Sequence, residues 1–155
     1  MTAMAQDDDI RITPEPLDVA AAVAFVTDGR AGGIDVFLGT TRAETSPDGS
    51  ELVALDYEAY EQMGLEQLRD LAHRARGQWS VVKLALLHRT GRVAVGEPSV
   101  VIAVSTPHRA ESFAACKWLI DALKEDVAIW KKEVWADGSG TWVHPSSSRL
   151  PPGEG

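Results

Sequence analysis

Residues 99–105, SVVIAVS, constrain the fold most strongly, because this run carries no charge and is rich in β-branched side chains. Its length and composition predict a strand that is buried on both faces. Residues 110–124 follow with apolar side chains at helical spacing, and Ser105 or Thr106 is the expected cap region of that helix. The chain is therefore expected to build its core around this central strand.

The other predicted elements mix strands and helices without a regular order. Strand patterns cover 10–14, 34–39, 52–58, 81–89 and 92–97, helical spacing covers 17–26 and 63–76, and residues 135–143 indicate a hairpin. Strict strand–helix–strand alternation is absent, so the sequence predicts an α+β fold around a mostly antiparallel sheet. The expected organisation is a flexible acidic arm (1–9), a single domain (10–143) and a disordered tail (144–155).

Composition excludes several classes of function. A net charge of −8 argues against general nucleic-acid binding. No apolar run approaches the ~20 residues of a membrane helix, and the N-terminus lacks a signal-peptide pattern, so a cytoplasmic protein is expected. Cys116 is the only cysteine and is expected to be a small buried side chain, while the four histidines lack metal-ligand spacing.

A local group of cations stands out in this acidic chain. His108 and Arg109 lie where the central strand is expected to pass into a helix, and helix N-termini favour anions. Lys124 and Lys131 follow, and crowding by other cations lowers the pKa of an amine. If residues 124–131 continued the helix, both amines would share one face, ~10.5 Å apart. From composition alone, a solvated helix face with local ion pairs is the commoner explanation of this stretch.

Five segments in this order resemble one known family. They are residues 37–42 (FLGTTR), 55–63 (LDYEAYEQM), 88–97 (HRTGRVAVGE), 104–109 (VSTPHR) and 123–133 (LKEDVAIWKKE). Together they closely resemble the catalytic (large) subunit family of molybdopterin synthase, over about residues 10–143. The resemblance implies an α/β hammerhead-type fold with an additional antiparallel β subdomain.

The resemblance also implies a reaction and partners. Sulfur would pass from the thiocarboxylated C-terminal Gly-Gly of a small ubiquitin-like carrier subunit to cyclic pyranopterin monophosphate (precursor Z), forming the dithiolene of molybdopterin. A homodimer with one carrier on each outer end would give a heterotetramer. Neither a metal nor a dissociable cofactor is implied, because the partner supplies the sulfur. Neither a nucleic acid nor a membrane is expected as a partner.

Individual site residues follow from the same resemblance. Lys124 and Lys131 would be the essential lysines. Substrate contacts would come from Arg42, His108 and Arg109, completed by Thr40, Thr41, Lys132 and Glu133, and Phe37 would lie on the path of the carrier tail. Family members often have a lysine at the position of Thr40, so either the phosphate has one cation fewer here or Lys132 substitutes. His88 and Glu97 are expected to hold a hairpin by hydrogen bonds, and Tyr57 to be a packing residue.

Two other functions are compatible with parts of this pattern. One is a non-catalytic homologue that only docks the sulfur carrier. The other is an unrelated enzyme for a phosphorylated ligand that uses His108, although neither a metal constellation nor a nucleophile–base pair is evident in the sequence.

Overall fold

The computed structural model describes residues 7–143 and contains eight strands and three helices there. The elements in chain order are β1 (Asp8–Thr13), α1 (Val19–Val26), β2 (Gly33–Thr40), β3 (Leu52–Ala59), α2 (Glu61–Gln78), β4 (Lys83–Arg89), β5 (Gly91–Ala94), β6 (Pro98–Thr106), α3 (Arg109–Asp126), β7 (Ile129–Trp135) and β8 (Gly140–Val143). Every predicted element is present. The mixed α+β architecture with a separate antiparallel sheet confirms the predicted fold class.

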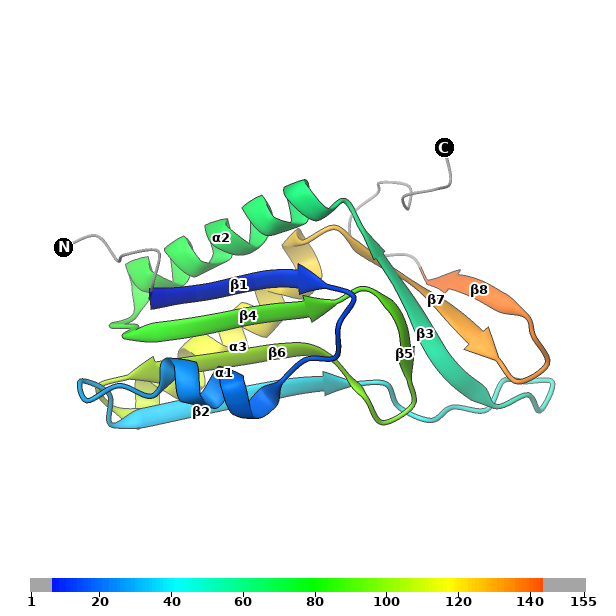
Figure 1. The fold of residues 1–155 in the computed structure, drawn as a ribbon, viewed down its shortest axis with the longest axis horizontal. Coiled ribbons are helices and arrows are strands. Elements are labelled where there is room, and N and C mark those ends of the chain that lie inside the picture. The colour runs from blue at the N-terminus through cyan, green and yellow to red at the C-terminus, as the bar shows by residue number, and fades with distance from the viewer. Residues whose placement is uncertain (1–6, 144–155) are drawn as a thin grey trace.

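The larger sheet has the strand order β1-β4-β6-β2. Only β1 and β4 are parallel, and the other neighbours are antiparallel. Helix α1 covers one face, and α2 and α3 cover the other (Figure 1). The strand β6 is buried from Ser99 to Thr106, as the uncharged run predicts. Its central place follows from that composition, because only an interior strand hides both faces from water.

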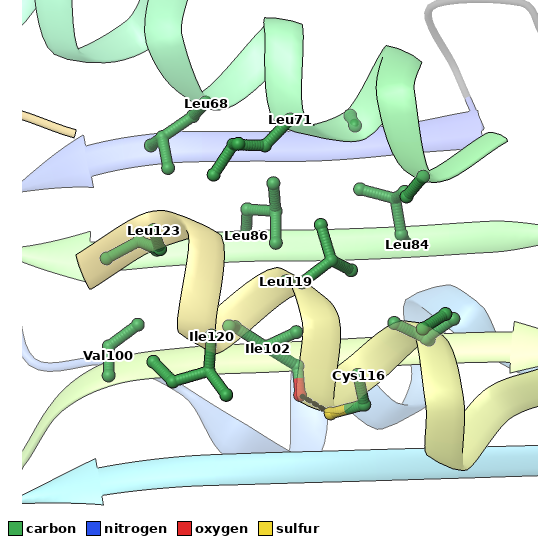
Figure 2. Close-up of a cluster of buried hydrophobic side chains, with 14 of the residues drawn as sticks. Leu68, Leu71, Leu84, Leu86, Val100, Ile102, Cys116, Leu119, Ile120 and Leu123 are labelled. Atoms are coloured by element: carbon green, nitrogen blue, oxygen red, sulfur yellow. Dashed lines mark hydrogen bonds between the residues drawn. The ribbon is translucent and has the colours of Figure 1, made fainter. Parts of the chain in front are cut away.

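The main core lies between α2, α3 and the larger sheet. Figure 2 shows Leu68 and Leu71 of α2 above Leu86 of β4, with Leu119 of α3 beside them. Cys116 belongs to this core at 2% exposure, which confirms its predicted burial. Burial and the nearby Asp35 carboxylate raise the pKa of the Cys116 thiol to about 12, so it stays protonated at neutral pH.

The smaller sheet has the order β5-β3-β7-β8 and is entirely antiparallel. It lies at one end of the larger sheet (Figure 1). Trp130 of β7 is its largest fully buried side chain, at 1% exposure, and meets the ring of Tyr60 edge-on at a centroid distance of 5.4 Å. The predicted hairpin is formed by β7 and β8, but β7 begins at Ile129 rather than near Trp135.

Two local predictions are wrong. The acidic arm does not extend to residue 9, because Asp8 and Asp9 pair with β4 and Arg76 Nη2 lies 2.6 Å from Asp8 Oδ1. The N-cap of α3 is His108, not Ser105 or Thr106. The Thr106 hydroxyl instead donates to the His108 carbonyl at 2.6 Å, which tightens the turn before the helix. Residues 1–6 of the arm and the predicted tail 144–155 lie outside the described residues.

Candidate functional site

A cavity of about 740 Å³ lies where the two sheets meet. Its walls come from the end of β2, the strands β3 and β7, the adjoining parts of β4 and β6, and the last turns of α3. The polar side chains that line it are Thr40, Arg42, Glu44, Tyr57, His88, Ser99, Lys124, Lys131 and Glu133. Apolar side chains such as Leu55, Ile120 and Leu123 complete the walls. The cavity therefore combines an apolar frame with three cationic side chains (Arg42, Lys124 and Lys131) and two carboxylates (Glu44 and Glu133).

Lys124 and Lys131 both line this cavity, but they do not share a helix. The helix α3 ends at Asp126, so Lys124 lies in its last turn and Lys131 is on β7. The predicted separation of ~10.5 Å between the two amines required one continuous helix over residues 124–131, so it does not apply. Instead, Lys131 stands opposite Tyr57 of β3, and Lys124 reaches the same cavity from the last turn of α3.

The two amines interact electrostatically. Burial and the Lys131 charge lower the pKa of Lys124. The place of Lys124 in the last turn of α3 favours its charged form, because the negative end of the helix dipole attracts a cation. Within residues 7–143 neither amine has a carboxylate oxygen within ion-pairing distance. The cavity thus holds two uncompensated amines, an arrangement that suits an anionic ligand or a proton transfer.

Arg42 and Thr40 join the lysines at the mouth of the cavity. The pairing of β2 with β6 shifts register between Gly39 and Thr40, and such a bulge re-aims the side chains that follow it. Arg42 is exposed, and its guanidinium lies 3.2 Å from the Glu44 carboxylate. Thr41 points elsewhere: it is 2% exposed, and among the described residues its hydroxyl has no hydrogen-bond partner.

Successive side chains of β7 point to opposite faces of the sheet, so Lys132 lies on the other face from Lys131 and Glu133. Lys131 and Glu133 face the cavity, whereas the Lys132 amine lies 5.8 Å from the ring centroid of Trp142 on the other face. Lys132 therefore does not replace the lysine that is missing at Thr40. Thr40 does line the cavity, but its hydroxyl adds no charge.

Three other predicted site residues lie outside the cavity wall. His108 and Arg109 are exposed at the opposite end of α3, about 22 Å from Lys124 along the helix axis. Phe37 is partly buried and packs against the main core. One chain therefore does not bring His108 and Arg109 to the lysines.

The sequence reasoning missed His88 and Tyr57 as cavity residues. Glu97 has the predicted structural role, accepting from the Ala94 N–H at 2.9 Å, but His88 also lines the cavity. The signal was the alternation along β4: Leu84 and Leu86 pack beneath α3, so His88, two residues on, lies on that same face. The rings of His88 and Tyr57 meet edge-on at 5.1 Å.

Acid is expected to destabilise the fold through His88. Burial and the Lys124 charge lower the pKa of His88 from 6.5 to about 4. Between these values the unfolded chain binds more protons than the folded one, so stability falls as pH falls. The loss between pH 7 and pH 4.5 is expected to be about 2 kcal/mol.

Urea unfolding of the wild type and His88→Asn at both pH values measures this effect. The variant cannot titrate at this position, so its loss should be smaller by about 2 kcal/mol. Equal losses in the two proteins would contradict the assignment of a neutral buried imidazole.

Within residues 7–143 no group of histidine, cysteine, aspartate or glutamate side chains is arranged to hold a metal ion. Over the same residues, none of the helices has the length and apolar character needed to cross a bilayer.

Comparisons with known proteins agree with this architecture. The family model described as MoaE protein matches residues 12–126. A molybdopterin synthase catalytic subunit from Nostoc sp. is 43% identical over 138 residues, covering 88% of this chain and 82% of the relative. One from Bos taurus is 42% identical over 135 residues, covering 87% of this chain and 70% of the relative.

Solved structures share the fold. A molybdopterin synthase crystal structure from Staphylococcus aureus superposes with a TM-score of 0.81 at 31% identity, covering 92% of this chain and 99% of that chain. A complex of subunits 1 and 2 of molybdopterin-converting factor from Helicobacter pylori superposes with a TM-score of 0.74 over 91% and 94% of the two chains. At 21% identity, the second comparison supports the fold alone.

Proposed function

Because the chain belongs to the MoaE family of molybdopterin synthase catalytic subunits, we propose that it transfers sulfur from a thiocarboxylated carrier protein to cyclic pyranopterin monophosphate. The product would be the dithiolene of molybdopterin. The observation that carries this proposal is the convergence of Lys124 and Lys131, from separate elements, on one cavity. Family membership excludes the alternative of an unrelated phosphate-ligand enzyme.

The chemistry needs cations because both reactants are anionic. A thiocarboxylate that approaches a phosphorylated pterin meets like charge, at a cost of about 4 kcal/mol per pair at ~4 Å and an effective dielectric of ~20. Arg42, Lys124 and Lys131 offset this repulsion. Arginine binds phosphate oxygens through its planar fork, and lysine supplies a titratable amine.

We assign the two lysines different roles. Lys124, whose pKa is lowered by burial and by Lys131, would exchange protons with the carrier's terminal carbonyl or stabilise its developing oxyanion. Lys131, facing the same space from β7, would hold or protonate the pterin as the cyclic phosphate opens. Sulfur comes from the carrier, so the proposed reaction uses neither a metal nor a dissociable cofactor.

The proposed assembly has two kinds of partner. A small ubiquitin-like carrier with a C-terminal Gly-Gly would insert its tail into the cavity. A second copy of the chain would bring its His108 and Arg109 toward the substrate, since α3 holds them about 22 Å from Lys124 within one chain. A homodimer with two carriers would be a heterotetramer. The cytoplasmic location stays a prediction.

A single-turnover assay tests the proposal. Purified protein, precursor Z and thiocarboxylated carrier are mixed, and molybdopterin is followed as its oxidised fluorescent derivative. Product in proportion to the protein supports a synthase. A folded protein that binds the carrier yet forms no dithiolene would instead be the non-catalytic docking homologue.

A further inference from the structure

The strand β6 changes the facing of its side chains where it reaches the cavity, which lies on the α3 side of the larger sheet. Val100 and Ile102 face the main core beneath α3 (Figure 2), whereas Val101 and Ala103 belong to the cluster that faces α1. Regular alternation would turn Ser99 toward α1 with Val101. Ser99 instead lines the cavity next to Val100 and is only 5% exposed.

The neighbouring strand β2 shows the same change. Phe37 packs against the main core and Leu38 is exposed, so the odd-numbered residues face the α3 side. Regular alternation would therefore turn Thr41 toward the cavity. The residues that line it are Thr40 and Arg42, and Thr41 is buried outside its wall. The facing of the side chains is thus reversed between Phe37 and Arg42, and this reversal brings the guanidinium to the cavity.

A β-bulge at the end of the β2–β6 pair accounts for both changes. Gly39 pairs with Val100 and Thr40 pairs with Pro98, so Ser99 stands between these pairs as the extra residue. Its hydroxyl donates to the Gly39 carbonyl at 3.3 Å, across the bulge. A Cβ atom at Gly39 would lie 2.5 Å from Val100 Cγ1, so a glycine is needed for the two strands to approach this closely.

The direction of Arg42 depends on the backbone that follows the bulge. The Thr41 N–H donates to the Glu97 carbonyl at 3.2 Å, and the Gly96 N–H donates to the Thr41 carbonyl at 2.8 Å. These two bonds fix the backbone next to Arg42. The Arg42 side chain is itself 84% exposed and contacts Glu44, so packing does little to orient it.

We propose that Ser99 is a positioning residue for Arg42, because its hydroxyl stabilises the bulge that turns Arg42 toward the cavity and its anionic substrate. The proposal rests on the proposed function for its effect on rate. Its effect on the backbone at Thr41 does not depend on turnover.

The other group that Ser99 contacts is Tyr57. Burial raises the pKa of Tyr57, and a hydrogen bond with Ser99 partly offsets that rise. Removing the Ser99 hydroxyl therefore changes the surroundings of the phenol as well as the bulge. The test has to separate an effect through Tyr57 from an effect through Arg42.

Two variants of equal shape isolate the hydroxyl. Ser99→Thr keeps the donor to Gly39, whereas Ser99→Val has a methyl group in its place. Both variants add the same branched carbon, so any steric effect is common to them. Single-turnover rates at subsaturating precursor Z are expected to be about 10-fold lower in Ser99→Val than in Ser99→Thr, because a small misplacement of a substrate-binding group is costly.

Double variants identify the residue through which Ser99 acts. In the Arg42→Ala background, Ser99→Val and Ser99→Thr are expected to differ by less than about 2-fold, because the side chain to be positioned is absent. In the Tyr57→Phe background, the difference of about 10-fold should persist. If the branched side chains prevent folding, Ser99→Ala and the wild type give the same comparison in each background.

Amide hydrogen exchange examines the bulge without turnover. The Thr41 N–H is expected to exchange at least about 5-fold faster in Ser99→Val than in Ser99→Thr, the effect of one lost hydrogen bond. The control is the Val82 N–H, which donates to the Ser105 carbonyl at 2.8 Å near the other end of β6. Its exchange should be the same in both variants.

Equal exchange at Thr41 in the two variants would overturn the proposal. A rate difference that persists without the Arg42 side chain, or that disappears in Tyr57→Phe, would overturn it as well. If the wild type forms no molybdopterin, the proposed function fails. The exchange at Thr41 then still decides whether the Ser99 hydroxyl stabilises the bulge.

Discussion

Replacing Lys124 with alanine is expected to lower the single-turnover rate of dithiolene formation by about 10²- to 10⁴-fold, the range for loss of a positioned proton donor or charge stabiliser. The fold should not suffer, because the substitution removes a partly buried cation that is repelled by Lys131. The free energy of unfolding is therefore expected to be no lower than in the wild type.

Lys117→Ala is the matched control for this prediction. Lys117 lies on the same helix, is exposed and pairs with Asp121 at 2.7 Å, so its removal should leave the rate unchanged. Lys124→Arg keeps the charge but has no proton to exchange near neutral pH. Full activity in Lys124→Arg would assign Lys124 an electrostatic role only, and full activity in Lys124→Ala would exclude it from the mechanism.

Replacing Trp130 with alanine is expected to lower the free energy of unfolding by about 3–5 kcal/mol, as for other fully buried aromatic residues. Trp130 is 1% exposed and lies next to Lys131 on β7, the strand that joins β3 to β8. Urea denaturation measures the loss. Because the indole fixes the strand that carries Lys131, the folded fraction of the variant should also turn over more slowly than the wild type.

Two comparisons sharpen the Trp130 prediction. Trp130→Phe keeps an aromatic ring in the site and should recover more than half of the stability. Trp142→Ala, on the edge strand β8 over Lys132, should cost less because Trp142 is only partly buried. A similar loss of unfolding free energy in Trp142→Ala and Trp130→Ala would contradict the prediction that the buried Trp130 stabilises the smaller sheet more than Trp142 does.

The sequence pattern predicted those elements whose burial depends on the composition of their own residues, and it failed where a distant contact decides. The central strand was evident because eight successive positions of β6 are buried and only apolar or small polar residues fit there. The end of α3 was not evident, since residues 124–131 contain no glycine or proline to stop a helix. A distant contact fixes the chain where it leaves the helix: the Ala128 N–H donates to the Gln67 side chain of α2 at 3.0 Å.

The residues of the candidate site likewise fall into those that the sequence identified and those that only the fold reveals. Lys124, Lys131, Arg42, Thr40 and Glu133 were named from the sequence, and all five line the cavity. Lys132 was misplaced because its prediction ignored the strand periodicity that turns it toward Trp142. His88 was overlooked as a cavity residue because the alternation that places it on the same face as Leu84 and Leu86 was not followed to the end of β4.

The walls of the cavity come from segments that are remote in sequence, and this has a consequence for the order of assembly. Tyr57 meets Lys131 only after β3 has paired with β7, and Lys124 joins them only after α3 has docked on the larger sheet. Contacts of such long range form slowly, because the chain must close large loops first. An incompletely folded chain therefore lacks the complete cavity, and Lys124 and Lys131 acquire their shared surroundings only when these long-range contacts have formed.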